Sequence, residues 1–97
     1  MARTKVLEGF DSNVDKFLEQ DAGVSNIIIS NVTNVNVKAS VRVNLGTAGS
    51  AHLVKDAVIP VGTSLLALNN QLLQTAASKI GVRTDTAGGI EVIYTAL

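Results

Sequence analysis

A strictly alternating segment in the middle of the chain constrains the fold more than any other feature. Every second residue between positions 35 and 44 is apolar. The apolar set is Val35, Val37, Ala39, Val41 and Val43. Successive side chains of a β-strand point to opposite faces, so this pattern predicts a strand with one buried and one wet face. A slip of one residue would turn all five apolar side chains into water, which fixes the register. We expect Lys38 and Arg42 on the opposite, wet or partner-facing side.

Strand and turn signals surround this segment on both sides. A β-branched run over residues 24–32 leads into it through a polar turn at Thr33-Asn34. Residues 52–59 form a strand that stops at Pro60, which lacks a backbone N–H, and Gly62 completes the turn. The other expected elements are a loop at 45–50, strands at 64–68, 71–73, 79–84 and 90–95, and turns at Asn69-Asn70 and 85–89. Short strands at this spacing predict an all-β fold, a single antiparallel β-sandwich of about seven or eight strands.

The N-terminal third is less regular. Residues 4–8 fit an edge strand. Residues 12–20 fit either a short helix or an irregular arm, because four apolar residues lie at helical spacing there. These residues, the N-terminal stripe, are Phe10, Val14, Phe17 and Leu18. We divide the chain into an N-terminal arm or short helix, residues 1–22, and a β-sandwich domain, residues 23–97. A sandwich completed by the second segment has little need of the stripe, so we expect the arm to dock on a neighbouring subunit.

Composition excludes several classes of function. Eight basic and eight acidic residues cancel, and aromatic residues are 3% of the chain, so neither a cationic stripe nor stacking platforms indicate nucleic-acid binding. The chain has no cysteine, which excludes disulfides and thiolate sites. The N-terminus lacks the apolar run of a signal peptide, and the longest apolar runs fall far short of the roughly 20 residues of a membrane span. We expect a soluble protein made in the cytoplasm.

Charged residues are also few, at 16% of the chain against about 25% in an average domain. Much of the surface is therefore neutral. A neutral surface suits a subunit that neighbouring subunits partly cover.

No residue stands out as a catalytic group or a ligand. His52 is the single histidine, and its place at the start of a strand is typical of a surface residue. Asp56 lies four residues further along, but no serine is marked as a nucleophile on a sharp turn. We therefore expect no enzymatic activity and no catalytic residues.

The acidic and glycine-containing segments have simpler explanations than metal or phosphate binding. Asp11, Asp15 and Glu19 would line one side of a helix, but they lack the loop and glycine of calcium motifs. Asp85 with Gly88-Gly89 is typical of a turn, because no helix follows to bind phosphate. The sequence Asn31-Val32-Thr33 fits a glycosylation acceptor, which has no meaning without a signal peptide. We expect no metal site, no cofactor and no cofactor-binding residues.

The second half of the chain carries a recognisable order of segments. A strand rich in Ile and Asn at residues 27–31 precedes the alternating strand and a loop of small residues. The segment Leu53 to Leu65 follows, with its Ile-Pro-Val-Gly turn, and residues 78–84 and 90–94 end the pattern. In this order, over residues 24–97, the chain resembles small β-sandwich virion proteins of tailed bacteriophages. The resemblance implies a head decoration (cement) protein, a neck or tail component, or a fibre module.

The resulting hypothesis is a structural virion protein, and within it a capsid decoration (cement) protein that binds and reinforces the head shell. A 97-residue chain without a fibre stalk favours this role over the neck or tail. The alternative is a neck, tail or tail-fibre component, including a host- or glycan-binding module, although three aromatic residues are few for sugar stacking. A small enzyme is the least favoured reading. Expected partners are further copies of the chain, as in a trimer, and the major capsid protein or another virion subunit, without nucleic acid or membrane. The expected location is the virion, assembled in the host cytoplasm.

Overall fold

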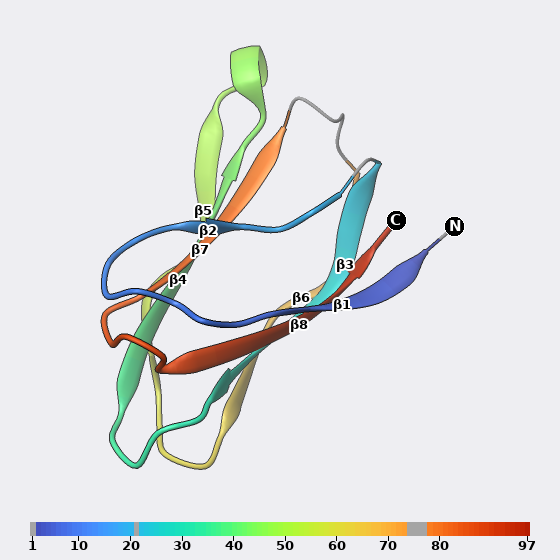
Figure 1. Ribbon diagram of the computed structural model, residues 1–97. Coiled ribbons are helices and arrows are strands. Elements are labelled where there is room, and N and C mark those ends of the chain that lie inside the picture. Colours follow the sequence, from blue (N-terminus) through green and yellow to red (C-terminus); the bar gives the residue numbers. More distant parts are fainter. Residues whose placement is uncertain (1, 21, 74–77) are drawn as a thin grey trace.

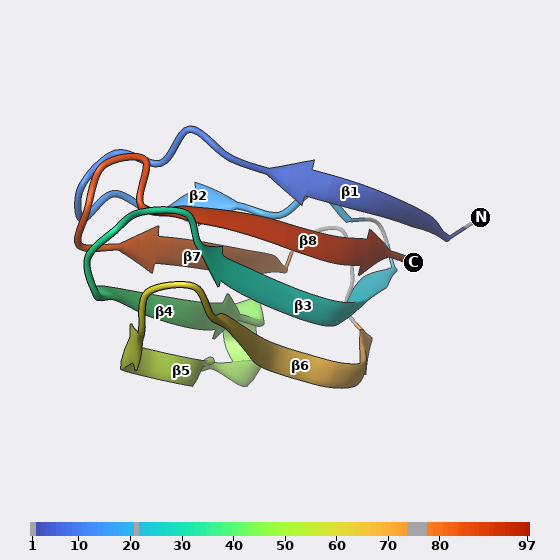
Figure 2. The same cartoon turned by 90° about the horizontal axis from the view of Figure 1, so that it is seen from below.

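The computed structural model describes residues 2–20, 22–73 and 78–97. These residues form two antiparallel four-stranded sheets (Figure 1). Sheet A has the order β1-β8-β3-β6 and sheet B the order β2-β7-β4-β5. The strands are β1 Arg3–Leu7, β2 Lys16–Phe17, β3 Gly23–Asn31, β4 Val37–Asn44, β5 Ser50–Ile59, β6 Ser64–Leu73, β7 Lys79–Thr84 and β8 Ile90–Ala96, with a 3₁₀ turn, η1, at Gly46–Ala48. Figure 2 shows the sheets as two layers, with β1 and β2 toward one side and β5 beside β6 at the other. The predicted all-β sandwich is confirmed.

The core lies between the two sheets and is built by alternation. In β4, Val37, Ala39, Val41 and Val43 are each at most 5% exposed, while Lys38 and Arg42 are exposed on the other face. The predicted register is confirmed for these residues. Val35 is the exception, because it precedes β4 and is 53% exposed. Its carbonyl oxygen accepts a hydrogen bond from the Asn31 side chain, which holds this segment in the loop before strand pairing starts.

Two bulges adapt the strands to this core. In β3, Val24 and Ile27 are both fully buried although they are three residues apart, which a regular strand forbids. The register against β8 shifts between Ser25 and Ile28, and Asn26 has φ 54°. In β5, Val54 and Ala57 both turn inward in the same way, with Asp56 at φ 49° between them. Each bulge inserts an extra residue that restores an inward side chain.

The expected turn at Asn69-Asn70 is wrong, because β6 runs through both residues. Strand β3 offers nine residues for pairing, and β6 pairs along that length from Ser64 to Leu73. The surplus residues of β6 are absorbed as register shifts opposite Ser25, Ile27 and Ile28, so the chain has no need to reverse. The turn at Pro60 is confirmed: the Thr63 N–H donates to the Pro60 carbonyl, and Gly62 has φ 75°.

The N-terminal segment belongs to both sheets. Strand β1 pairs with β8 at the edge of sheet A, as expected, and β2 pairs with β7 at the edge of sheet B. Of the two alternatives for residues 12–20, the short helix is absent from the described residues. The Leu18 N–H donates instead to the Ile80 carbonyl and the Asn13 N–H to the Thr84 carbonyl. No described helix is long and apolar enough to cross a membrane.

The N-terminal stripe is split by this strand geometry. Phe10 and Leu18 are buried at 2% and 5% exposure, whereas Val14 and Phe17 are about half exposed at 53% and 52%. The expectation that the domain's own core has no need of the stripe is therefore wrong for Phe10 and Leu18. Pairing of β2 imposes a period of two, which sends Leu18 inward and Phe17 outward, in place of the helical period that would keep all four residues together.

Candidate functional site

Positive charge is concentrated on the outer face of sheet B. Five of the chain's eight basic side chains lie there: Lys38, Arg42, Lys55, Lys79 and Arg83. Asp15 and Asp56 lie among them, and Asp85 lies next to Lys38. This face therefore carries more positive than negative charge, although the whole chain is neutral.

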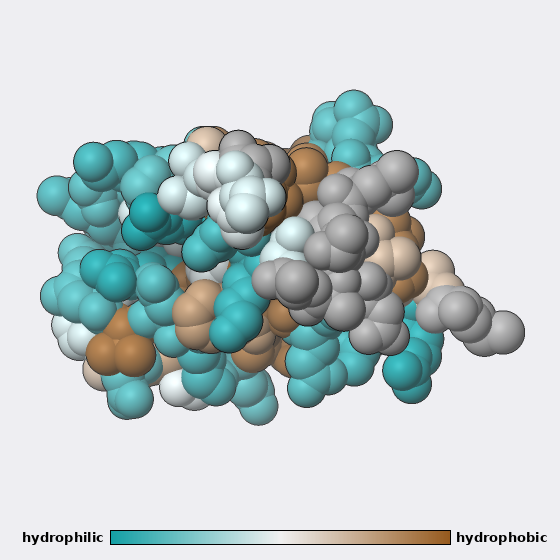
Figure 3. Space-filling view, turned by 90° about the horizontal axis from the view of Figure 1, so that it is seen from above, coloured by the Kyte–Doolittle hydropathy of each residue, from teal (hydrophilic) through white to brown (hydrophobic). Residues whose placement is uncertain are grey.

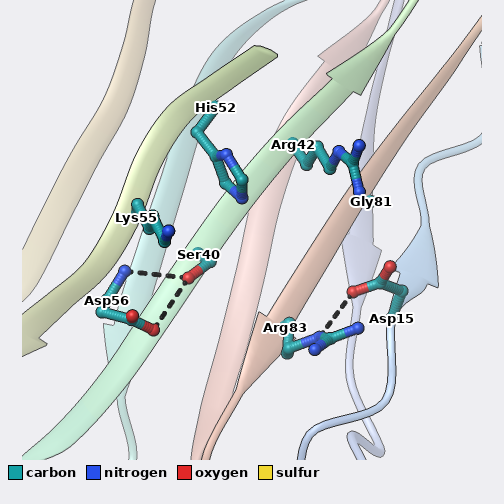
Figure 4. A pocket seen from close by; sticks show the side chains of 8 residues that line it. All are labelled: Asp15, Ser40, Arg42, His52, Lys55, Asp56, Gly81 and Arg83. Carbon is teal, nitrogen blue, oxygen red and sulfur yellow. Dashed lines mark hydrogen bonds and ion pairs between the residues drawn. The ribbon is translucent and has the colours of Figure 1, made fainter. Parts of the chain in front are cut away.

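The centre of this face is hollowed. The sheet B hollow has a volume of about 210 Å³. Strand β4 contributes Ser40 and Arg42, and β7 contributes Gly81 and Arg83. Its other lining residues are Asp15, His52, Lys55 and Asp56. Arg42 lies directly between Gly81 and His52 in the sheet register, and Ser40 lies opposite Arg83. Figure 4 shows His52, Lys55 and Asp56 of β5 on one side of the hollow, Asp15 and Arg83 on the other, and Ser40 of β4 between them, with Arg42 reaching toward Gly81.

The bulged course of β5 brings three of these side chains to one face. His52 and Lys55 are three residues apart and would point to opposite faces of a regular strand. The register shifts on both sides of Val54 place His52, Lys55 and Asp56 together along the hollow. The Ser40 hydroxyl accepts a hydrogen bond from the Asp56 N–H at 2.9 Å, and it lies 3.4 Å from Asp56 Oδ1. This contact fixes the bulge residue.

Partners hold two of the cations in place. Arg83 Nε donates to Asp15 Oδ1 at 2.8 Å, and Arg42 Nη2 donates to Ser50 Oγ at 3.0 Å. Lys55 and the His52 ring have no hydrogen bond or ion pair within the described part of the chain. Gly81 forms the floor, and its backbone does not have a positive φ. A Cβ at this position would lie 3.2 Å from Phe17 Cε1, so the glycine here provides space.

The hollow brings Ser40, His52 and Asp56 together, but it does not form a catalytic triad. A triad needs a hydrogen bond from the serine to the histidine and another from the histidine to the carboxylate. In the described structure the Ser40 hydroxyl contacts Asp56 directly, and His52 has no hydrogen bond to either residue. The described residues of the hollow therefore lack the hydrogen bonds that would activate Ser40 as a nucleophile.

The outer face of sheet A is different in chemistry. The apolar row consists of four residues, one from each strand: Val6, Ile93, Ile28 and Leu66. Each is paired directly with the next across the sheet. Val6, Ile93 and Leu66 are 62%, 45% and 52% exposed, and Ile28 is partly buried. Seen from the end that carries η1, hydrophilic residues predominate on the left of the view, and hydrophobic patches reach the surface at the lower left, the centre and the right (Figure 3).

Serine and threonine line both sides of the apolar row. Ser30 and Ser64, paired across β3 and β6, share a hydrogen bond of 2.9 Å on one side, next to Glu91. Thr4 and Thr95 are paired on the other side. Sequence reasoning missed this row, although a signal existed. Consecutive apolar residues in a strand, such as Ile27-Ile28-Ile29, place apolar side chains on both faces.

The acidic residues considered as a metal site are separated. Asp15 pairs with Arg83, while Glu19 pairs with Lys5 Nζ at 2.7 Å. The hydrogen bond from Lys5 and its charge lower the pKa of Glu19. Asp11 is exposed. No group of three or more His, Cys, Asp or Glu side chains suited to a metal ion occurs among the described residues.

The remaining two candidates have structural roles. Asn31 is buried, and its Nδ2 donates to the carbonyl oxygens of Val35 at 2.7 Å and Ile59 at 2.9 Å, so it cannot act as a glycosylation acceptor in the folded protein. Asp85 Oδ1 accepts the Lys38 backbone N–H at 3.0 Å. That hydrogen bond lowers the pKa of Asp85, as a carboxylate in a turn bonded to backbone would show.

Comparison of the chain with protein-family models, with curated proteins and with solved structures finds no match.

Proposed function

We propose that this chain is a structural virion protein of a tailed bacteriophage, a capsid decoration (cement) subunit that binds and reinforces the head shell. Two kinds of support carry the proposal. One is the order of strands and turns over residues 24–97 that resembles such proteins. The other is the apolar row on the outer face of sheet A, which is the single structural observation that favours an assembly role.

The apolar row has the character of a protein contact surface. Fully burying an exposed aliphatic side chain stabilises an interface by about 1.5–3 kcal/mol. Three of the four residues are about half exposed or more, so covering the row would contribute a few kcal/mol to each contact. Contiguous apolar surface rimmed by polar residues is the pattern that marks protein interaction sites. Here the rim is formed by serine and threonine.

The proposal assigns the apolar row to contacts between copies of this chain. The four residues of the row are uncharged, so the row itself meets its own copy without charge repulsion, and Glu91 lies at its border beside Ser30. The row also runs from β1 to β6, which are the two edges of sheet A, so a neighbouring copy can approach from either side. A trimer held in this way leaves the outer face of sheet B free, and the assembled subunits bind the capsid protein.

Immunogold labelling of purified virions tests the functional proposal. The antibody is raised against the full chain and applied to virions from a phage that encodes it. Gold over the head, at many copies per particle, is the expected result. Gold confined to the neck, tail or fibres would replace the decoration role with the alternative role. Unlabelled virions, with the protein detected in the infected cell, would overturn the virion assignment.

A further inference from the structure

We propose that the sheet B hollow binds an acidic saccharide, a sugar unit that bears a carboxylate. This inference does not depend on the decoration role, because it concerns the opposite face of the molecule. It starts from the mixture of groups in the hollow, which combines the cations Arg42 and Lys55 with the carboxylates Asp15 and Asp56.

The cations supply the site for the acid group. Arg42 and Lys55 approach the hollow from neighbouring strands, and His52 lies next to Arg42 (Figure 4). The Lys55 ammonium has no ion pair within the described residues, and Arg42 uses Nη2 on Ser50, leaving further N–H groups of its guanidinium. A guanidinium binds a carboxylate with parallel hydrogen bonds. The excess positive charge of the face would draw an anion toward it.

The carboxylates supply sites for hydroxyl groups. Asp15 and Asp56 are each bonded through Oδ1, and their second oxygens accept no hydrogen bond from the described residues. Two carboxylates would repel an acidic peptide, which carries negative charge and few hydroxyls. They would accept hydrogen bonds from the hydroxyls of a sugar. The combination therefore favours a ligand with an acid group and several hydroxyls over a simple anion or an acidic peptide.

The size and surroundings of the hollow fit one or two sugar units. Its volume of about 210 Å³ is below the roughly 300 Å³ at which pockets for drug-sized ligands begin. A second hollow of about 170 Å³ continues from it and shares Asp15, Arg42 and Gly81. Phe17, Asn44 and Lys79 line this extension. Phe17 is 52% exposed, whereas Phe10 and Tyr94 are each 2% exposed. Lys79 Nζ lies 5.4 Å from the centre of the Phe17 ring, so an exposed aromatic ring and a cation line the place where a second sugar would lie.

A binding titration with matched ligands tests the proposal. The ¹⁵N-labelled full chain is titrated with digalacturonate, with the neutral disaccharide lactose, with acetate and with a tetra-aspartate peptide. The expected result is saturable movement of the Arg42, His52 and Gly81 amide signals with digalacturonate and weaker binding of the other three. No saturable binding of digalacturonate would overturn the proposal. Equal or tighter binding of acetate or the peptide would also overturn it, in favour of an unspecific anion site or a peptide site.

Substitutions inside and outside the hollow distinguish binding in the hollow from general attraction to the positive charge of the face. Arg42→Gln should weaken digalacturonate binding about tenfold or more, because a hydrogen bond to a charged group is lost. Gly81→Ala should also weaken digalacturonate binding, because the added methyl group takes up space at the bottom of the hollow. Lys38→Gln removes an equal charge from the same face outside the hollow, and it should keep the affinity within about twofold. Thermal melting checks that each variant is folded. Equal losses in Arg42→Gln and Lys38→Gln, or full affinity in both hollow variants, would contradict the assignment.

Discussion

The two sheets are alike on their inner faces and opposite on their outer faces. Inside, both sheets present mainly Val and Ile to one core, in an alternation that the bulges of β3 and β5 interrupt. Outside, sheet A has the apolar row between serine and threonine, and sheet B has a hollow in a face that carries five cations and fewer carboxylates. The buried residues of the two sheets therefore determine the fold, and the exposed residues of each sheet can differ without changing it. The two outer faces can accordingly bind different partners.

The largest effect on stability is expected from a substitution in the core that both sheets form. Val41→Asp places an unpaired carboxylate in the core, where Val41 is 0% exposed, and we expect the variant not to fold. Arg42→Gln, at the next position on the outer face, should melt cooperatively near the wild-type temperature. Circular dichroism during thermal melting measures both. Cooperative melting of Val41→Asp would show that the inner face of β4 is misassigned.

A smaller loss is expected where the sheets are tied to each other. The Asn31 side chain in β3 donates to the Ile59 carbonyl in β5, and its Oδ1 accepts the Thr33 N–H at 2.8 Å. Asn31→Ala leaves buried groups unpaired and should lower the free energy of unfolding by about 2 kcal/mol. Asn34→Ala, in the same loop but exposed, should change it by less than about 0.5 kcal/mol. Urea unfolding compares them, and equal losses would show that Asn31 does not join the sheets.

Acid should lower the free energy of unfolding by a still smaller amount, through the Asp85 contact at the end of β7. The folded pKa of Asp85 is lowered, mainly by the Lys38 backbone N–H. Its contribution to stability is therefore present above the unfolded pKa and is lost as the pH falls through the folded pKa. Asp85 is exposed, so the effect should be at most a few tenths of a kcal/mol. The difference in unfolding free energy between wild type and Asp85→Asn should shrink between about pH 5 and pH 2. A constant difference would argue against this contact.

Sequence reasoning was strong for the inner faces and weak for the outer ones. Alternation identified Val37 to Val43 because a buried face leaves a period-two pattern in a single strand. It could not show that Phe10 and Leu18 belong to the core, because that depends on β2 pairing with the distant β7. The turn expected at Asn69-Asn70 was wrong because a bulge and a turn share local residue preferences. The hollow joins residues from positions 15 to 83, and no local pattern specifies the order β2-β7-β4-β5.

The most direct test of the central claim, that sheet A carries the assembly surface, uses two substitutions of one residue type. Val6→Lys changes the apolar row, and Val58→Lys changes a similarly exposed valine on the outer face of sheet B. Val6 is 62% exposed and Val58 is 54% exposed, and both lie on edge strands. Each should alter stability by less than about 0.5 kcal/mol. Sedimentation velocity at micromolar concentration measures the assembly of all three proteins. We predict that the wild type and Val58→Lys self-associate while Val6→Lys sediments as a monomer. A monomeric wild type, or equal assembly of the two variants, would contradict the account.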